Sequence, residues 1–249
     1  MQAAALAALR DGSLTMRRLL AGLTAAALCT GQAAAQARDP INPTCPAQPN
    51  WSNYPSMQFT AATKSGVRVL LAEGRIDATT PTKLQAALDE HSDVEEIWLR
   101  SPGGDARAGT QAGFIIRETL MPTRIPSGWT CFSACNFMFM GGRARAVDPG
   151  GVFMVHMFTH LADGSATRQE AARGGDRTVG LIGEIEQASA LLATEDNDFL
   201  IRMGVSRNLL SDVMYQVRAV PTGRNTETRR CLTPKELEDY GVSNAEGED

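Results

Sequence analysis

The feature that most constrains the fold is an alternation of short apolar runs with stretches whose apolar residues recur at helical spacing. Strand-like runs lie at residues 67–76, 97–99 and 152–155, and the first alternates apolar and polar positions as a half-buried strand does. Helical spacing follows Thr80, where Pro81 takes the first helical position, and returns at residues 108–119 and 131–140. Strands and helices that alternate in this way predict a one-domain α/β fold with parallel strands and crossover helices.

The C-terminal half is predicted to be mainly helical, with loops between the helices. Residues 161–176 are rich in Gly, Ala and Arg, which predicts an exposed loop or flap. An amphipathic helix is expected over 181–203, a shorter one over 209–214, and a last one from Thr233 to Gly241. Residues 217–230 show no regular pattern and are expected to be irregular.

The N-terminus has the organisation of a secretory signal peptide. Arg17 and Arg18 precede an apolar run at 19–28, and Ala35-Gln36-Ala37 is a small-x-small cleavage site, so residues 1–37 are predicted to be removed, with Met16 as an alternative start. The apolar run has about half the roughly 20 residues that a membrane span needs, so we expect no membrane span and a periplasmic or secreted protein. Residues 38–60 are predicted to form an extended arm, and residues 61–249 the folded domain.

The mature part keeps four cysteines, and an exported protein meets conditions in which disulfides persist. Cys131 and Cys135 are four residues apart, and a bond between them would close a very small loop. We favour the alternative in which these two cysteines pair with Cys45 and Cys231, because that arrangement ties both ends of the chain to its centre.

Charge and histidine spacing argue against several classes of ligand. The chain has 24 Lys and Arg against 28 Asp and Glu, so it lacks the basic footprint of a nucleic-acid-binding protein. His91, His156 and His160 do not recur at zinc-ligand spacing with the cysteines. We therefore expect no nucleic acid, no metal and no cofactor.

Three features are able to supply catalytic groups, and the fold would bring them to the carboxyl ends of the strands. Residues 101–104, Ser-Pro-Gly-Gly, follow a strand, and two glycines permit a backbone that points N–H groups outward. Ser133 stands near the start of an expected helix, and His156 ends a buried strand as a candidate general base. Each feature alone has a structural alternative: a tight turn, an N-cap serine and a packed histidine. The Gly-x-Ser-x-Gly pattern of an α/β-hydrolase is absent.

The order and spacing of these features resemble the proteolytic subunit of the Clp protease and the wider ClpP/crotonase superfamily. The resemblance is carried by residues 71–76, by 97–104 (Ile-Trp-Leu-Arg-Ser-Pro-Gly-Gly), by Cys-Phe-Ser-Ala-Cys at 131–135, by Met-Val-His at 154–156 and by the segment 232–242. It covers about 175 residues and is strongest over 71–160. It implies a ClpP/crotonase-like fold of repeated β-β-α units with parallel strands and crossover helices.

The resemblance also implies roles for individual residues. Ser133 would be the nucleophile, His156 the general base, and the N–H groups of Gly104 and Ala134 the oxyanion hole, which are the groups that acyl transfer requires. The chain departs from the family at the catalytic acid, because Arg229 occupies the expected position. Glu227 is the candidate that replaces it.

Asp196 and Asp198, on the expected long helix, are weaker candidates for the acid. The function expected from these residues is an exported serine hydrolase, peptidase-like, acting on a peptide or a small ester or amide. An inactive protein of the same fold that binds a peptide or serves as a scaffold is the alternative. Crotonase-type thioester chemistry, a Ser–Lys dyad and a thiol nucleophile at Cys131 or Cys135 are less favoured. Self-association through residues 181–203 is expected, and a Clp ATPase partner is not.

Overall fold

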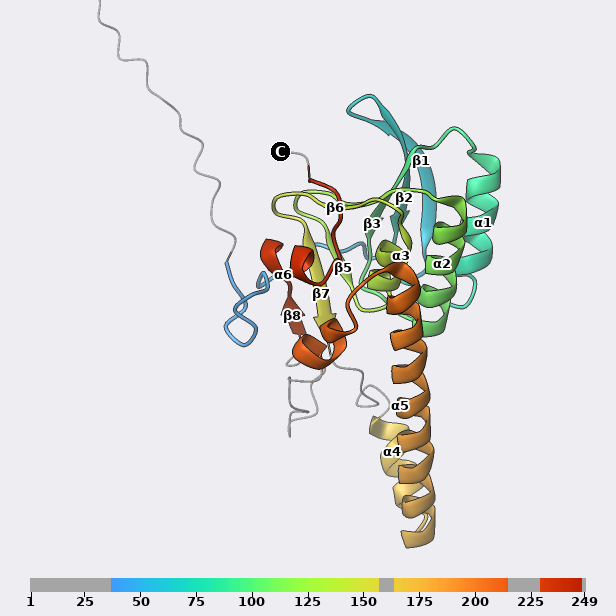
Figure 1. The fold of residues 1–249 in the computed structure, drawn as a ribbon. Coiled ribbons are helices and arrows are strands. Elements are labelled where there is room, and N and C mark those ends of the chain that lie inside the picture. The colour runs from blue at the N-terminus through green and yellow to red at the C-terminus, as the bar shows by residue number, and fades with distance from the viewer. Residues whose placement is uncertain (1–36, 157–163, 215–228, 248–249) are drawn as a thin grey trace, which may run out of the picture. The chain divides into compact units, whose positions relative to one another are not determined.

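The larger of two β-sheets is built around parallel strands (Figure 1). The computed structural model describes residues 37–156, 164–214 and 229–247. This sheet contains β1 (Gln58–Lys64), β2 (Val67–Glu73), β3 (Glu96–Arg100), β4 (Thr123–Ile125) and β6 (Arg145–Val147), in the order β1-β2-β3-β4-β6. Only the β1–β2 pair is antiparallel, whereas β2–β3, β3–β4 and β4–β6 are parallel.

Helices connect the parallel strands. Crossover helices α1 (Thr80–Glu90) and α2 (Ala106–Thr119) join β2 to β3 and β3 to β4, and α3 (Cys135–Gly141) precedes β6. The core between helices and sheet is apolar, and Leu84, Ile97 and Ile116 in it are 0% exposed. The expected α/β class with parallel strands and crossover helices is confirmed.

A second, smaller sheet has the order β5-β7-β8. It consists of β5 (Thr130–Phe132), β7 (Val152–His156) and β8 (Arg229–Cys231), with β5 parallel and β8 antiparallel to β7. A parallel bridge between Ser101 and Cys131 joins the residue after β3 to β5, so the two sheets are in contact at this point. This bridge brings the carboxyl ends of β3, β5 and β7 to one region.

Strand β1 was not expected, because the sequence pattern predicts the first strand only at residues 67–76. Its seven residues pair with β2 along their full length, from Gln58–Glu73 to Lys64–Val67. The connection is the two-residue turn Ser65-Gly66, with φ of 48° and 85°. Positive φ at both turn residues matches the twist of a β-hairpin, and glycine adopts it without steric cost.

The segment around residue 165 differs from the expected exposed loop. Residues Gly164–Ala171 form helix α4, which packs on α5 (Gly175–Met203). Glu170 forms ion pairs with Arg173 and Arg177, and these join the helix to the turn and to α5. The glycines of this segment suggested a loop, but the described helix between them contains Ala, Arg, Gln and Glu, which favour helix.

Helix α5 is buried only near its C-terminal end. Phe199 is 0% exposed and makes edge contacts with Phe114 of α2 and Phe137 of α3. Further towards the N-terminus, Val179 and Ile182 are 70% and 52% exposed. The last two turns therefore anchor the helix to the core, while the earlier turns pack on α4 and leave apolar side chains in contact with solvent.

Burial of Asp196 in α5 makes the stability of the fold depend on pH. Burial raises the pKa of this carboxyl group from 3.8 to about 7, and Glu195 adds to the rise. The folded state therefore binds a proton that the unfolded chain has released, so stability falls as the pH rises from about 4 to 7 and then levels off. At pH 8 we expect Asp196→Asn to be more stable than the wild type by about 2–4 kcal/mol.

Urea unfolding at pH 4 and pH 8 measures this effect. The difference between Asp196→Asn and the wild type should be large at pH 8 and small at pH 4. Asp198→Asn is the matched control, since Asp198 lies on the exposed side of the same helix. A stabilisation of Asp196→Asn that is equal at both pH values would contradict the assignment to a buried carboxyl group.

The four cysteines pair differently from the preferred prediction. Disulfides join Cys45 to Cys231 and Cys131 to Cys135. The favoured pairing of Cys131 and Cys135 with the two terminal cysteines is wrong, because the turn between β5 and α3 brings the Cα atoms of Cys131 and Cys135 within 5.4 Å. The Cys45–Cys231 bond fixes the N-terminal arm to β8.

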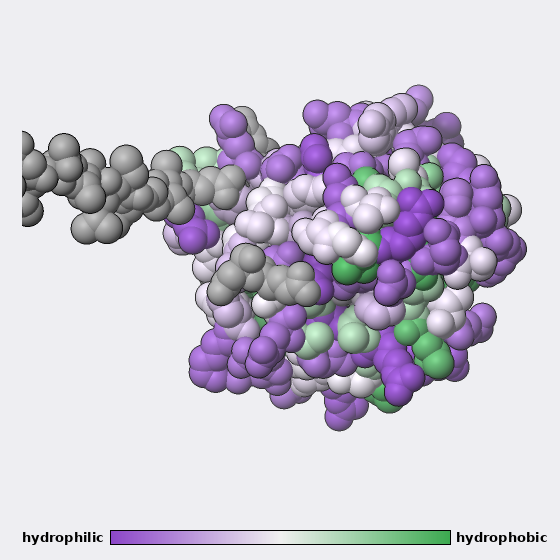
Figure 2. All heavy atoms as spheres, turned by 90° about the horizontal axis from the view of Figure 1, so that it is seen from above, coloured by the Kyte–Doolittle hydropathy of each residue, from purple (hydrophilic) through white to green (hydrophobic). Residues whose placement is uncertain are grey.

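Hydrophilic residues predominate on the face shown in Figure 2, and hydrophobic residues occur there in small separate groups. Surfaces of this kind are common on soluble domains and do not indicate a docking site. Among the described residues, no helix has the length and apolar character needed to cross a membrane.

Candidate active site

Ser133 lies in a sharp turn between a strand and a helix. Its φ is +58°, in the left-handed region that residues other than glycine rarely adopt. The expected helix over 131–140 is therefore corrected: β5 continues through Phe132, and α3 begins only at Cys135. The run is nearly all apolar because both elements are buried, and in that case periodicity does not distinguish a strand from a helix.

The structure brings Ser133 and His156 together. His156 is the last residue of β7, and the distance from its Nε2 atom to Ser133 Oγ is 2.7 Å. Parallel pairing of β5 with β7 explains the contact, because Phe132 pairs with Met154 and the Ser133 N–H donates to the Met154 carbonyl. Both side chains extend from the carboxyl ends of neighbouring strands. A hydroxyl in hydrogen-bond contact with an imidazole is the arrangement of an activated nucleophile and its base.

The glycine loop after β3 packs against the serine turn. Ser101 Oγ accepts a hydrogen bond from the Gly103 N–H and donates one to the Gly74 carbonyl, which fixes the start of the loop. Gly103 has φ of +79°, and a Cβ atom on it would lie 2.8 Å from Ser133 Cβ and 2.5 Å from the Phe132 carbonyl oxygen. Only glycine permits an approach this close.

Two backbone N–H groups of this region have no acceptor among the described residues. The bridge between Gly104 and Ile76 uses the Gly103 carbonyl and the Asp105 N–H, which leaves the Gly104 N–H out of the pairing. Ala134 follows Ser133 and precedes the first turn of α3, where N–H groups lack intrahelical partners. Within the described ranges, neither N–H donates to another group. Both are therefore available to a ligand.

The Cys131–Cys135 disulfide spans the serine turn, with two residues of separation on each side of Ser133. It holds the end of β5 to the first residue of α3. A left-handed residue costs roughly 1–2 kcal/mol, and the covalent bond supplies a restraint that keeps Ser133 in that conformation. We expect the double variant Cys131→Ala/Cys135→Ala to react with a serine-directed phosphonate about 10-fold more slowly.

Thermal unfolding of the same double variant is the control. A loop this short restricts the unfolded chain little, so the melting temperature should change much less than on removal of Cys45–Cys231, which closes a loop of 186 residues. An unchanged rate of phosphonate labelling in the double variant would show that the disulfide does not position Ser133.

The catalytic acid is not found among the described residues. Arg229 occupies the expected position and pairs with His156 in the β7–β8 register. Glu227, the predicted substitute, lies outside the described residues. In the part of the chain that is described, no hydrogen bond joins Asp196 or Asp198 to His156.

Other nucleophile arrangements receive no support from these contacts. Lys83 donates to Ser56, and Lys235 pairs with Asp239, so both are engaged away from Ser133. Cys131 and Cys135 are oxidised, which removes the free thiol that a cysteine nucleophile needs. Within the described ranges, no cluster of His, Cys, Asp and Glu is arranged to hold a metal ion.

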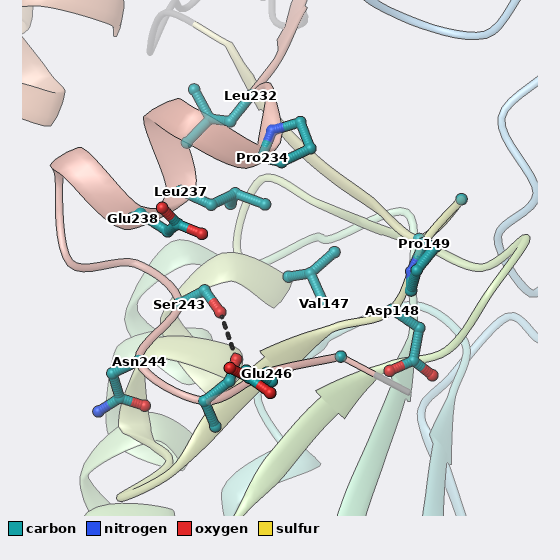
Figure 3. Close-up of a pocket in the computed structure, with 14 residues that line it drawn as sticks. Val147, Asp148, Pro149, Leu232, Pro234, Leu237, Glu238, Ser243, Asn244 and Glu246 are labelled. Carbon is teal, nitrogen blue, oxygen red and sulfur yellow. Dashed lines mark hydrogen bonds between the residues drawn. The ribbon is translucent and has the colours of Figure 1, made fainter. Parts of the chain in front are cut away.

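A pocket of about 580 Å³ lies elsewhere, between the β6–β7 turn, α6 (Pro234–Asp239) and the chain after Ser243 (Figure 3). Asp148, Glu238 and Glu246 give its wall three carboxylates, and Asp148 forms an ion pair with Arg124. None of the predicted catalytic residues lines this pocket. We assign it no role in catalysis.

Comparison with known proteins gives a partial likeness in structure only. No protein-family model matches the chain, and no curated protein is similar to it in sequence. A mutant of ClpP1 from Listeria monocytogenes is 17% identical with a TM-score of 0.47, over 73% of this chain and 91% of that chain.

Two mutants of the 1510-N membrane-bound stomatin-specific protease, one in complex with a substrate peptide, are each 16% identical with a TM-score of 0.43. The matches cover 73% of this chain and 78% and 74% of those chains. These values assign no activity to this chain.

Proposed function

We propose that this chain is an exported serine hydrolase, peptidase-like, that cleaves a peptide or a small ester or amide by acyl transfer. The observation that carries the proposal is the 2.7 Å contact between Ser133 Oγ and His156 Nε2, made by a serine in a left-handed strand-to-helix turn. A buried structural serine needs neither this backbone conformation nor a histidine partner.

In the proposed reaction, His156 Nε2 takes the proton from Ser133 Oγ as the oxygen attacks the substrate carbonyl carbon. The negative charge that develops on the carbonyl oxygen is stabilised by the N–H groups of Gly104 and Ala134. Breakdown of the tetrahedral intermediate breaks the bond to the leaving group, which receives the proton from His156. A water molecule then attacks the acyl-enzyme with His156 again as base, and Ser133 is regenerated.

The acid of the triad belongs to the proposal as well. If Nε2 accepts the serine proton, Nδ1 carries the other ring proton and needs an acceptor. Glu227 is the proposed acceptor, two residues before the start of β8, whose first residue pairs with His156.

Export and self-association are further parts of the proposal. All four cysteines of the predicted mature chain are in disulfides, which supports a periplasmic or secreted location and argues against a Clp ATPase partner. Exposed Val179, Ile182 and Leu191 along α5 support a homo-oligomer.

One observation favours a second function. Arg229 stands opposite His156 where a triad would have its acid, and a cation neither orients a neutral imidazole nor stabilises an imidazolium. An inactive peptide-binding or scaffold protein of the same fold is the alternative that this residue favours.

Labelling with a fluorophosphonate separates the two functions. The mature chain is treated under non-reducing conditions, and the adduct is located by intact mass and peptide mapping. We expect one adduct per chain, on Ser133, and none in Ser133→Ala. A folded sample with both disulfides intact that forms no adduct would contradict the hydrolase and favour the scaffold.

A further inference from the structure

Arg229 places a positive charge beside the proposed catalytic pair. It is the first residue of β8 and pairs directly with His156 in antiparallel register, so both side chains lie on the same face of the small sheet. Its guanidinium carbon is 5.1 Å from the centre of the Phe132 ring, and that ring is 4.8 Å from the His156 imidazole. One aromatic ring therefore contacts both the cation and the base.

A second ring holds the guanidinium from the N-terminal arm. The Trp51 ring is 5.3 Å from the guanidinium carbon and is stacked with Phe132 at 5.7 Å. The faces of two aromatic rings attract a cation and restrict its position. The Cys45–Cys231 disulfide ties the same arm to β8, so the cation is fixed before any ligand arrives.

Arg229 differs from two other described arginines whose buried Nε atoms also lack an acceptor. Nε of Arg229, Arg100 and Arg230 is buried without a hydrogen-bond acceptor. Arg100 nevertheless pairs with Glu73, and Arg230 with Glu236. No carboxylate in the described ranges lies within 4.0 Å of the Arg229 guanidinium.

Burial lowers the pKa of Arg229, and the Asp39 carboxylate opposes this change. Asp39 makes no ion pair with Arg229 and instead accepts hydrogen bonds from the Ile41 N–H and the Asn42 amide. A half-buried cation that is held by two rings and has no ion-pair partner among the described residues has the properties of a receptor for an anion.

We infer that Arg229 binds a carboxylate of the substrate, so that the chain cleaves acidic peptides or esters in preference to neutral ones. The planar guanidinium matches a carboxylate through two parallel hydrogen bonds, and its faces remain on the rings. The inference rests on the proposed function and specifies its substrate class. The carboxylate comes either from an acidic side chain or from a free C-terminus of the substrate.

Matched substrates distinguish these two sources. One pair of peptide esters has Glu or Gln immediately before the scissile bond, and a second pair has a free acid or an amide beyond it. We expect the wild type to favour the acidic member of one pair about 10- to 100-fold in kcat/KM. The pair that shows the preference identifies the source of the carboxylate.

Substitution of Arg229 tests whether this residue causes the preference. Arg229→Met keeps the apolar stem on the rings and should reduce the acidic-to-neutral ratio to about one, whereas Arg229→Lys should keep part of it. The control is Arg230→Met, because the neighbouring Arg230 pairs with Glu236 and should leave the ratio unchanged. A purely structural role of Arg229 would lower both rates together without changing their ratio.

Failure of the inference is distinguishable from failure of the proposed function. If the wild type is labelled at Ser133 but shows no charge preference in either substrate pair, the inference alone is wrong. The same holds if the Arg229→Met variant keeps the preference. Absence of the Ser133 adduct overturns the hydrolase, and the substrate assignment with it.

Discussion

Replacement of His156 by alanine is expected to slow the acylation of Ser133 by about 10³-fold or more. The serine hydroxyl would lose its 2.7 Å partner, and with it the base that takes its proton as it attacks. Deprotonation by bulk water is far less effective at neutral pH. The measurement is the second-order rate constant for phosphonate labelling, together with kcat/KM for an ester substrate.

Non-additivity provides the internal check. When two residues act as one catalytic unit, removing both slows the reaction little more than removing one. The double variant Ser133→Ala/His156→Ala should therefore hydrolyse the substrate no more slowly than Ser133→Ala. His91→Ala is the matched control, since His91 lies at the C-terminal end of α1. Retention of acylation within a few-fold in a folded His156→Ala protein would remove His156 from the mechanism.

Much of the candidate site was predictable because it depends on local patterns that a parallel sheet brings together. Residues 101–104 were expected to follow one strand, and His156 to end another. Parallel strands present their carboxyl ends at the same edge, so local assignments were enough to predict that these groups lie close together. The contact between Ser133 and His156 agrees with that prediction.

Other features were not predictable, and each has a physical reason. Residues 131–140 form a nearly continuous apolar run, so the sequence pattern does not reveal the change from strand to helix at Ser133. The disulfide between Cys131 and Cys135 depends on that left-handed turn, which no residue-type preference for serine indicates. Strand β1 was missed because none of its residues is fully buried, so its sequence has only a weak apolar alternation.

The sequence showed that Arg229 stands where the acid was expected, but it did not reveal which residues surround the guanidinium. Trp51 lies 178 positions earlier in the chain and Phe132 lies 97 positions earlier, and only the folded chain brings them to the guanidinium. Contacts between residues this distant in sequence leave no periodic pattern. The anion-binding role therefore had to come from the structure.

Arg145 is the residue whose loss should harm folding most. It is 3% exposed, and its guanidinium donates to the carbonyl oxygens of Gly142, Met203, Gly241 and Val242 at 2.8–3.3 Å. These carbonyls lie at or just after the C-terminal ends of three helices, α3, α5 and α6, where backbone acceptors lack intrahelical partners. One buried side chain thus joins three helix ends.

The charge of Arg145 is compensated by these carbonyls instead of a carboxylate. Burial lowers its pKa to about 10, and the nearby Arg117 adds to this effect, but the group remains a cation at neutral pH. The C-terminal end of a helix carries partial negative charge, so three of them together stabilise a buried guanidinium. The site therefore depends on both the charge and the number of donors.

Arg145→Met is expected to destabilise the protein by more than about 4 kcal/mol, because the Gly142, Gly241 and Val242 carbonyls would lose this donor at about 1–3 kcal/mol each. The Met203 carbonyl would keep its hydrogen bond from Arg117. A loss of that size is comparable with the whole stability of many domains, so the variant should melt more than about 10 °C lower or be recovered unfolded. Arg145→Lys keeps the charge but has its three donors on a single nitrogen atom. Its stability should therefore lie between those of the wild type and Arg145→Met.

The neighbouring Arg143 provides the comparison that makes the test specific. Its side chain is exposed, and Arg143→Met should change the melting temperature by less than about 2 °C. Both substitutions remove one positive charge from the same turn, so a general effect of net charge would appear equally in both variants. If Arg145→Met melts as the wild type does, the helix ends are satisfied without the guanidinium, and the three helices are held in place by apolar packing alone.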